Sequence, residues 1–93
     1  MTNYSRGASF ERAVKKRFEY LGDLAIRSAG SHGVIDVLII ESSGRKVFVQ
    51  CKLSGRISDA DARELKGLAE RYGALALLAY RSKKGIEFKE VRI

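Results

Sequence analysis

Apolar residues recur near the start of the chain with the spacing of an α-helix. Phe10, Val14 and Phe18 follow one another at intervals of four, and Leu21 comes three residues later. This spacing places all four on one face of a helix. Because Gly22 stands where such a helix should stop, the pattern predicts a helix over residues 8–21.

Three β-strands are predicted after this helix. Residues 24–27 alternate apolar and other side chains, and residues 34–40 are mostly β-branched and apolar. Residues 46–53 alternate again, so that successive side chains point to opposite faces. Because the Ser-Ser-Gly sequence at residues 42–44 favours a turn, the second and third strands are expected to form a hairpin.

A second helix and two more strands complete the pattern. Ser58 is a good helix cap and Gly73 a good helix end, so a helix is predicted between them. Residues 74–80 are apolar without interruption, as in a strand that is buried on both faces. After a turn at residues 82–85, residues 86–93 are predicted to form a last strand at the edge of the sheet.

The predicted order of elements is α-β-β-β-α-β-β. A strand–helix–strand crossover implies a parallel pair, whereas the hairpins are antiparallel. The predicted fold class is therefore α/β, with a central mixed five-stranded sheet flanked by helices. With 93 residues, the chain is expected to form a single domain over residues 1–93.

Composition and charge narrow the classes of function. Lys and Arg number 18 against 11 Asp and Glu, which gives a net charge of +7. Such a charge favours nucleic acid as the partner, then an anionic membrane, although a basic domain without a polyanionic partner stays open. The single cysteine excludes an internal disulfide framework and a cysteine-based zinc site. This cysteine usage fits a reducing, cytoplasmic location, nucleoid-associated or viral, and no apolar run has the length of a membrane span.

Three polar positions on the predicted hairpin are candidates for chemistry. Asp36 interrupts an apolar strand, where a carboxylate loses hydration unless a cation or strong donors compensate. In the hairpin it falls opposite Gln50 or Lys52, whose side chains share one face. The alternatives are a hydrogen bond from Asp36 to the amides of residues 30–33 and an ordinary solvated polar face on the third strand.

Glu11 is a fourth candidate, because it borders the apolar stripe of the first helix. The alternative for Glu11 is an ion pair with Lys15, one helical turn further on. Cys51 alternates away from the polar face of its strand, so a role in packing is expected for it.

Together these residues resemble the PD-(D/E)xK nuclease superfamily and, within it, archaeal-type Holliday junction resolvases. The resemblance spans about residues 5–80 and rests on the segments Ser5-Arg6-Gly7, Phe10-Glu11-Arg12, Ile26-Arg27-Ser28-Ala29-Gly30-Ser31, Asp36 and Gln50-Cys51-Lys52. The Arg-Ser-Ala-Gly-Ser stretch is its most diagnostic part. The restriction-endonuclease-like core of this superfamily has the order α-β-β-β-α-β, which matches the first six elements predicted here.

The resemblance implies a site for Mg²⁺, with Mn²⁺ as a substitute. The implied ligands are oxygens of Glu11, Asp36, Gln50 and the backbone carbonyl of Cys51. Lys52 is implied to position or activate the attacking water, and Ser31 to lie in the loop beside the site. Carboxylate and carbonyl oxygens are the hard ligands that Mg²⁺ prefers.

The resemblance also implies contacts with DNA. Arg6 and Arg27 are implied to hold phosphates near the scissile bond. A wider basic face is expected to follow the DNA backbone by shape, and it comprises Arg12, Lys15, Lys16, Arg17, Arg56, Lys83 and Lys84. Ser31 and His32, in the same glycine-rich loop, are further candidates for DNA contact; a solvated loop position is the alternative for His32.

Two positions depart from the family pattern. Ile35 stands where the family usually has a proline, and Gln50 stands where it usually has an acid. A neutral ligand weakens the binding of a divalent metal and makes a two-metal site less favourable. Mrr-like restriction nucleases resemble this chain in having Gln-x-Lys at this place.

The leading hypothesis is a structure-selective endonuclease that resolves four-way DNA junctions by paired symmetric nicks. The alternatives are an Mrr-like endonuclease for duplex DNA and a non-catalytic DNA-binding module with a degenerate nuclease site. Because two nicks need two active sites, a homodimer is expected, with its interface at the apolar strand 74–80 or at the edge of the sheet. Neither a membrane nor a small-molecule substrate is expected as a partner.

Overall fold

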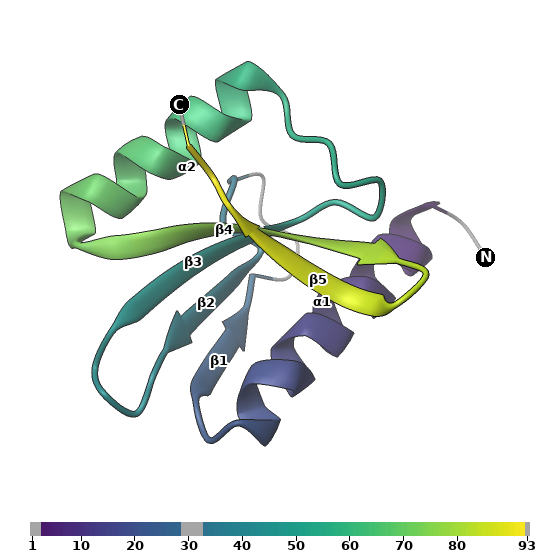
Figure 1. The fold of residues 1–93 in the computed structure, drawn as a ribbon, viewed down its shortest axis with the longest axis horizontal. Coiled ribbons are helices and arrows are strands. Elements are labelled where there is room, and N and C mark those ends of the chain that lie inside the picture. The colour runs from purple at the N-terminus through teal and green to yellow at the C-terminus, as the bar shows by residue number, and fades with distance from the viewer. Residues whose placement is uncertain (1–2, 29–32, 93) are drawn as a thin grey trace.

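The computed structural model of this chain describes residues 3–28 and 33–92. Its elements are α1 (Asn3–Tyr20), β1 (Leu24–Arg27), β2 (Val37–Ile40), β3 (Lys46–Cys51), α2 (Asp59–Tyr72), β4 (Ala74–Ser82) and β5 (Gly85–Glu90). The strands form one twisted sheet in the order of the sequence, with α1 on one side and α2 on the other (Figure 1). The predicted fold class and the predicted order of elements are confirmed.

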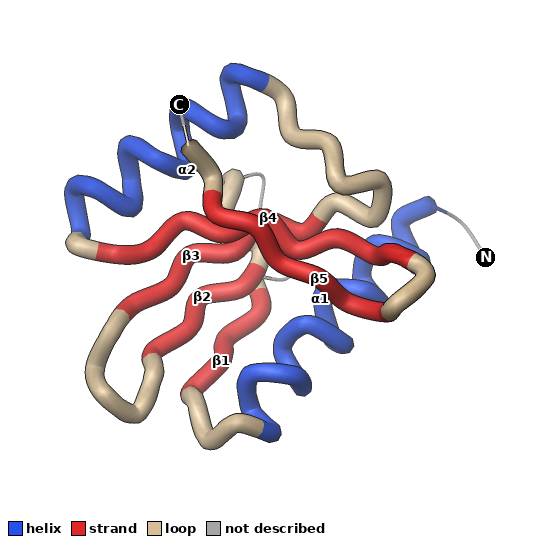
Figure 2. The backbone as a smooth tube through the Cα atoms, in the orientation of Figure 1, coloured by secondary structure: helices blue, strands red, loops and turns tan. Residues whose placement is uncertain are grey.

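The sheet is mixed, as the crossover predicted. β1 pairs with β2, β2 with β3, and β4 with β5, and all three pairs are antiparallel. β3 and β4 are parallel neighbours, because α2 returns the chain across the sheet between them (Figure 2). β1 and β5 are therefore the two edges, and the prediction that the last strand lies at an edge is confirmed.

The face of the sheet beneath α1 is closely packed. Phe10, Val14 and Phe18 on α1 are buried against Ile39 of β2 and other strand residues. At the far edge, the Phe18 ring meets the Phe88 ring of β5 edge to face, with 5.3 Å between centroids. Three residues of the predicted apolar stripe thus form the centre of this core. The fourth, Leu21, lies beyond the end of α1 and is 64% exposed, so its assignment to the buried face is wrong.

The face beneath α2 is packed over only part of its width. Leu65 and Ala69 on α2 are buried against residues of β3 and β4. On β1, at the other edge, the side chains of Leu24 and Ile26 are 59% and 50% exposed. α2 therefore covers the β3–β4 half of this face and leaves apolar residues of β1 in contact with solvent.

The second helix has the ends that the sequence predicted. The Ser58 hydroxyl accepts a hydrogen bond from the Asp61 backbone N–H, at 3.1 Å, and so caps the first turn. Gly73 adopts the left-handed conformation, with φ of 67°, and ends the helix. The strand that follows, β4, has core residues on both of its faces, as predicted.

The first helix begins earlier than residue 8, at Asn3. The prediction placed the start at the apolar stripe, but a helix continues upstream wherever nothing stops it. No proline occurs in the chain, and Gly7 lies within the helix at a cost of about 1 kcal/mol relative to alanine.

The second strand begins later than predicted, at Val37 rather than Val34. Val34 and Ile35 both pack on the α2 side of the sheet. In a strand, two successive side chains point to opposite faces, so these two residues cannot belong to one. Asp36 therefore lies just before β2 rather than within it.

The remaining boundaries differ at strand ends. The third strand was expected to end at residue 53 but ends at Cys51, and the fourth continues two residues beyond 80, to Ser82. The last strand ends at Glu90 because Val91 turns into the core under α2, where it is buried. Within the described residues, no helix is long and apolar enough to cross a membrane.

Candidate active site

Asp36 lies at the end of the sheet where β2 begins and β3 ends. Its backbone N–H donates to the Val49 carbonyl at 2.8 Å. The Cys51 backbone N–H donates to its carboxylate Oδ2, also at 2.8 Å. Asp36 thus contacts the residues on both sides of Gln50, and the prediction that it falls opposite Gln50 or Lys52 is confirmed.

The donor to this carboxylate differs from the alternative considered for Asp36. That alternative was a bond to the amides of residues 30–33, whereas the observed donor is the amide of Cys51. Residues 29–32, with the candidates Ser31 and His32, lie outside the described residues.

The environment of Asp36 disfavours its charge. The pKa of the carboxyl is raised from 3.8 to about 6, chiefly by burial and to a smaller extent by the neighbouring Glu11 carboxylate. The Cys51 N–H, Lys52 and Arg27 act in the opposite direction and lower the pKa. A cation beside this carboxyl would offset both desolvation and like-charge repulsion.

Glu11 reaches the site from α1. Its Oε1 accepts a hydrogen bond from Arg27 Nε on β1 at 3.0 Å, and both side chains are mostly buried, at 20% and 15% exposure. Lys15 pairs with Glu19 instead, at 2.6 Å, so the alternative of a Glu11–Lys15 pair is wrong. Arg27, expected to contact phosphate, is thus the ion-pair partner of an implied metal ligand.

Gln50 is the most buried polar residue of the site. It is only 5% exposed, and it projects from β3 toward α2. Its Nε2 donates to Asp61 Oδ2 on the first turn of α2, at 3.5 Å. Among the described residues, its Oε1 has no hydrogen-bond partner, so a buried acceptor is left free for a ligand.

Lys52 and Cys51 have different environments. Lys52 is half-buried and close enough to Asp36 to lower the pKa of that carboxyl. The Cys51 side chain packs against the core under α1. Burial, followed by the charges of Asp36 and Glu11, raises the pKa of its thiol, so the thiol stays protonated and acts in packing as predicted.

The donor atoms at this sheet end fit one hard cation. The Glu11 carboxylate is close enough to Asp36 to raise its pKa, and the Cys51 backbone N–H donates to Asp36. Gln50 precedes Cys51 on β3, and its Oε1 is unpaired among the described residues. No group of three Asp, Glu, His or Cys side chains that could hold a metal occurs in residues 3–28 and 33–92. Carboxylate, amide and backbone carbonyl oxygens are the donor types that hard cations such as Mg²⁺ or Mn²⁺ prefer.

The basic residues expected to contact DNA are mostly free in solvent. Exposed positions include Arg6, Arg12, Lys16 and Arg17 on α1, Arg56 before α2, and Lys83 and Lys84 in the β4–β5 turn. Lys15 is half-buried and paired with Glu19. Arg81, which the sequence analysis did not single out, lies over the Phe10 ring at 5.4 Å and joins β4 to α1.

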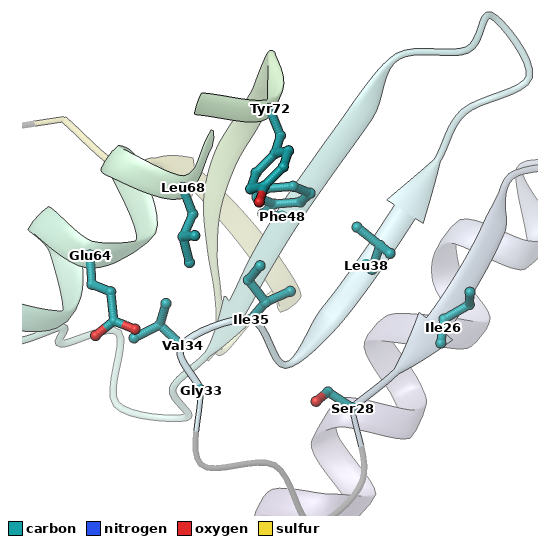
Figure 3. Close-up of a pocket in the computed structure, with 10 residues that line it drawn as sticks. All are labelled: Ile26, Ser28, Gly33, Val34, Ile35, Leu38, Phe48, Glu64, Leu68 and Tyr72. Atoms are coloured by element: carbon teal, nitrogen blue, oxygen red, sulfur yellow. The ribbon is translucent and has the colours of Figure 1, made fainter. Parts of the chain in front are cut away.

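An apolar groove lies on the open part of the α2 face, away from these polar residues. Its volume is about 570 Å³. The side chains that define it are Ile26, Val34, Ile35, Leu38, Phe48, Leu68 and Tyr72, with Glu64 at the rim (Figure 3). None of the predicted catalytic residues in the described part of the chain lines this groove, which is separate from the candidate active site.

Asp61 is the residue of the site that the sequence analysis missed. Its position in the first turn of a helix explains an acid there through the helix dipole alone. A signal was nevertheless present, because the crossover from β3 through α2 brings the start of α2 close to the end of β3. Only the packed structure shows that Asp61 meets Gln50.

Comparison with known proteins shows the family to which this chain belongs. Residues 2–92 match the sequence model of the family described as archaeal Holliday junction resolvase (hjc). A crossover junction endodeoxyribonuclease Hjc from Methanocaldococcus jannaschii is 38% identical over 80 residues, which are 82% of this chain and 59% of that protein. The chain thus spans less than two thirds of that relative.

A solved structure has the same fold. The Holliday junction resolvase Hjc of Archaeoglobus fulgidus superposes with a TM-score of 0.78 at 23% identity, over 92% of this chain and 73% of that one. This likeness supports the fold, and the match to the family model extends over nearly the whole sequence. The chain therefore belongs to the archaeal Holliday junction resolvase family.

Proposed function

We propose that this chain is a metal-dependent endonuclease that resolves four-way DNA junctions. The observation that carries the proposal is the polar end of the sheet, where Asp36 lies near Lys52 and the Glu11–Arg27 pair. Gln50 belongs to the same end of β3, since the residues on both sides of it form hydrogen bonds with Asp36. Membership of the resolvase family supports it, as does the net charge of +7. Buried ionisable groups contribute little to the stability of a fold, and groups with a perturbed pKa cluster at functional sites.

The proposed ligands of the cation are Asp36, Gln50 Oε1, the Cys51 carbonyl and Glu11. When bound, Mg²⁺ or Mn²⁺ supplies Lewis-acid activation of water and neutralises phosphate oxygens. Asp36 is held in place by the Cys51 N–H, which occupies one carboxylate oxygen. Arg27 fixes Glu11 and balances part of the negative charge of the site when no cation is present.

Lys52 has a separate proposed role. Hydrolysis of a phosphodiester adds negative charge to the non-bridging oxygens as water attacks and the leaving oxygen departs. An ammonium group beside Asp36 lies where it can orient the water and stabilise that charge. The exposed basic residues of α1 then hold the DNA backbone without reading its sequence.

A second copy of the chain is the proposed partner. Paired nicks need two active sites, and a twofold dimer supplies them. The proposed interface is the apolar groove together with exposed Leu24 and Ile26, because these form a continuous apolar surface on the open face. The expected interface at strand 74–80 is wrong, since β4 is an inner strand with core on both faces.

A panel of substrates tests the function. The protein is incubated with Mg²⁺ or Mn²⁺ and a synthetic four-way junction, a linear duplex or a flap of matched sequence. Paired, symmetric cuts in the junction alone are expected. Equal cutting of all three would instead indicate a general or Mrr-like nuclease, and binding without cutting would indicate a non-catalytic module.

A further inference from the structure

Gln50 presents a problem of orientation that an acid at the same position does not have. The two oxygens of a carboxylate are equivalent, whereas an amide has an oxygen on one side and an NH₂ donor on the other. Only the oxygen can serve as a ligand for a cation. A neutral ligand at this position therefore works only if something turns its oxygen toward the metal and its nitrogen away.

Asp61 supplies that constraint. Its carboxylate, when ionised, accepts hydrogen bonds and cannot donate them. It lies 3.5 Å from Gln50 Nε2, so the opposite orientation of the amide would place two acceptors against each other. Electrostatic repulsion between the two acceptors thus selects the orientation of the Gln50 amide in which its nitrogen faces Asp61 on α2.

The remaining atom of the amide fits this picture. Gln50 is 5% exposed, and its Oε1 has no hydrogen-bond partner among the described residues. A buried acceptor is unfavourable when nothing binds it, because it has lost its hydrogen bonds to water. Its position on β3 lies between Val49 and Cys51, which both contact Asp36.

We propose that Asp61 is a positioning residue that holds the Gln50 amide with its oxygen available to the metal. This inference rests on the proposed function of the site. It also explains how glutamine can replace the acid here: the α2 acid that orients an amide would repel a carboxylate at residue 50. Asp61 and Gln50 are thus a matched pair.

The test compares Asp61→Asn with Asp59→Asn. Both variants remove one acidic charge from the first turn of α2, but Asp59 is exposed and is not the hydrogen-bond partner of Gln50. An asparagine at residue 61 can donate as well as accept, so the Gln50 amide is free to turn over. The Ser58 cap uses the Asp61 backbone and is kept in both variants.

Mn²⁺ binding, measured by calorimetry without DNA, is the first readout. Loss of a group that orients a ligand typically weakens metal binding by about 10-fold or more. We expect a loss of about 10-fold for Asp61→Asn and less than about 2-fold for Asp59→Asn. The side-chain amide signals of Gln50 in a ¹H–¹⁵N spectrum should also shift in Asp61→Asn alone.

Repeating the substitution in a Gln50→Glu background separates positioning from simple charge. A carboxylate at residue 50 needs no orientation and is repelled by Asp61, so Asp61→Asn should now tighten Mn²⁺ binding. Weaker binding in both backgrounds would show a general charge effect and overturn the inference. Equal affinities of Asp61→Asn and Asp59→Asn would also overturn it.

Junction cleavage by the unmodified protein distinguishes this failure from failure of the proposed function. If Asp61 positions a metal ligand, excess Mn²⁺ should restore cleavage by Asp61→Asn, which a misfolded site would not allow. Normal cleavage and Mn²⁺ binding by the unmodified chain with no effect of Asp61→Asn would overturn the positioning role alone. Absence of both Mn²⁺ binding and cleavage in the unmodified chain would overturn the two proposals together.

Discussion

The two faces of the sheet are covered to different extents. Under α1, the core extends from Ala25 at one edge of the sheet to Phe88 at the other. Under α2, the close packing stops near the middle of the sheet, and Ile26 of β1 is 50% exposed and lines the apolar groove. One face is thus complete within a single chain, and the other is not.

The two faces make different contributions to the molecule. The α1 face supplies the buried area that holds the strands in register, and the register in turn brings Asp36 to Gln50. The α2 face adds the Asp61 contact over its covered half and offers an apolar surface over its open half. The polar residues of the site lie at the sheet end, between the two.

A matched pair of isoleucines gives the largest test of this comparison. Ile39 on β2 is fully buried under α1, with 0% exposure, whereas Ile26 on β1 is half exposed. Ile39→Ala should lower the free energy of unfolding by about 2–5 kcal/mol, because it removes buried methyl groups and leaves a cavity. Ile26→Ala should change the free energy of unfolding by less than about 1 kcal/mol when the protein is dilute enough to be monomeric.

Urea denaturation followed by circular dichroism measures both changes. If Ile39→Ala does not fold, Ile39→Val serves instead, with an expected loss of about 0.5–1.5 kcal/mol. Equal losses at the two positions would show that the open face is covered within the monomer.

Lys52 tests whether the sheet end is catalytic rather than structural. Lys52→Met keeps the length of the side chain and removes the charge beside Asp36. We expect single-turnover junction cleavage to fall about 100-fold or more, with junction binding changed by less than about 3-fold. Lys46→Met, at the other end of β3, is the control and should cut normally. Unchanged cleavage by Lys52→Met would remove Lys52 from the mechanism.

The open face is tested by a charge placed within it. Ile26→Asp would bury a carboxylate in the proposed dimer interface. In the monomer, residue 26 is half exposed, so water can still solvate the new carboxylate. The dissociation constant of the dimer, from analytical ultracentrifugation, should rise about 10-fold or more. A dimer of unchanged stability would place the interface elsewhere.

Much of the fold follows from the sequence because its signals are local. The ends of α2 depend on Ser58 and Gly73, and the opposition of Asp36 and Gln50 depends on a tight turn between two strands. The start of β2 was missed because Val34 and Ile35 are apolar enough for a strand but both turn toward α2. The pattern of apolar residues alone does not show toward which face of the sheet these two side chains point.

The candidate site was predictable in its members but less so in their contacts. Glu11 and Arg27 are 16 residues apart and meet only because α1 packs across β1. Asp61 meets Gln50 for a similar reason, since α2 docks over the end of β3. Such pairs depend on how helices dock on the sheet, which the spacing of residues along the chain does not fix.

The pH dependence of stability tests the burial of Asp36. Its pKa is raised to about 6, so the folded state disfavours the charged form. Stability from this group is therefore full below about pH 4 and is lost as the pH rises through 6. After allowance for partial exposure, the loss by pH 8 should be about 1–2 kcal/mol.

Asp36→Asn removes this titration, so it isolates the contribution. In EDTA, the variant should gain stability over the unmodified chain as the pH rises from 4.5 to 8, with no such gain below pH 4. Urea denaturation at each pH gives the difference. If the difference in the free energy of unfolding between the two proteins stayed constant from pH 4 to pH 8, the charge of Asp36 would not destabilise the folded state.

Cleavage of a four-way junction by Asp36→Asn is the most direct measurement of the proposed site. Asparagine keeps an oxygen that can accept the Cys51 N–H but removes the charge that holds a divalent cation. With Mg²⁺ or Mn²⁺, the unmodified protein should make paired symmetric cuts. The variant should bind the junction with similar affinity and make no detectable cuts. Normal cutting by Asp36→Asn would contradict the placement of the active site at this end of the sheet.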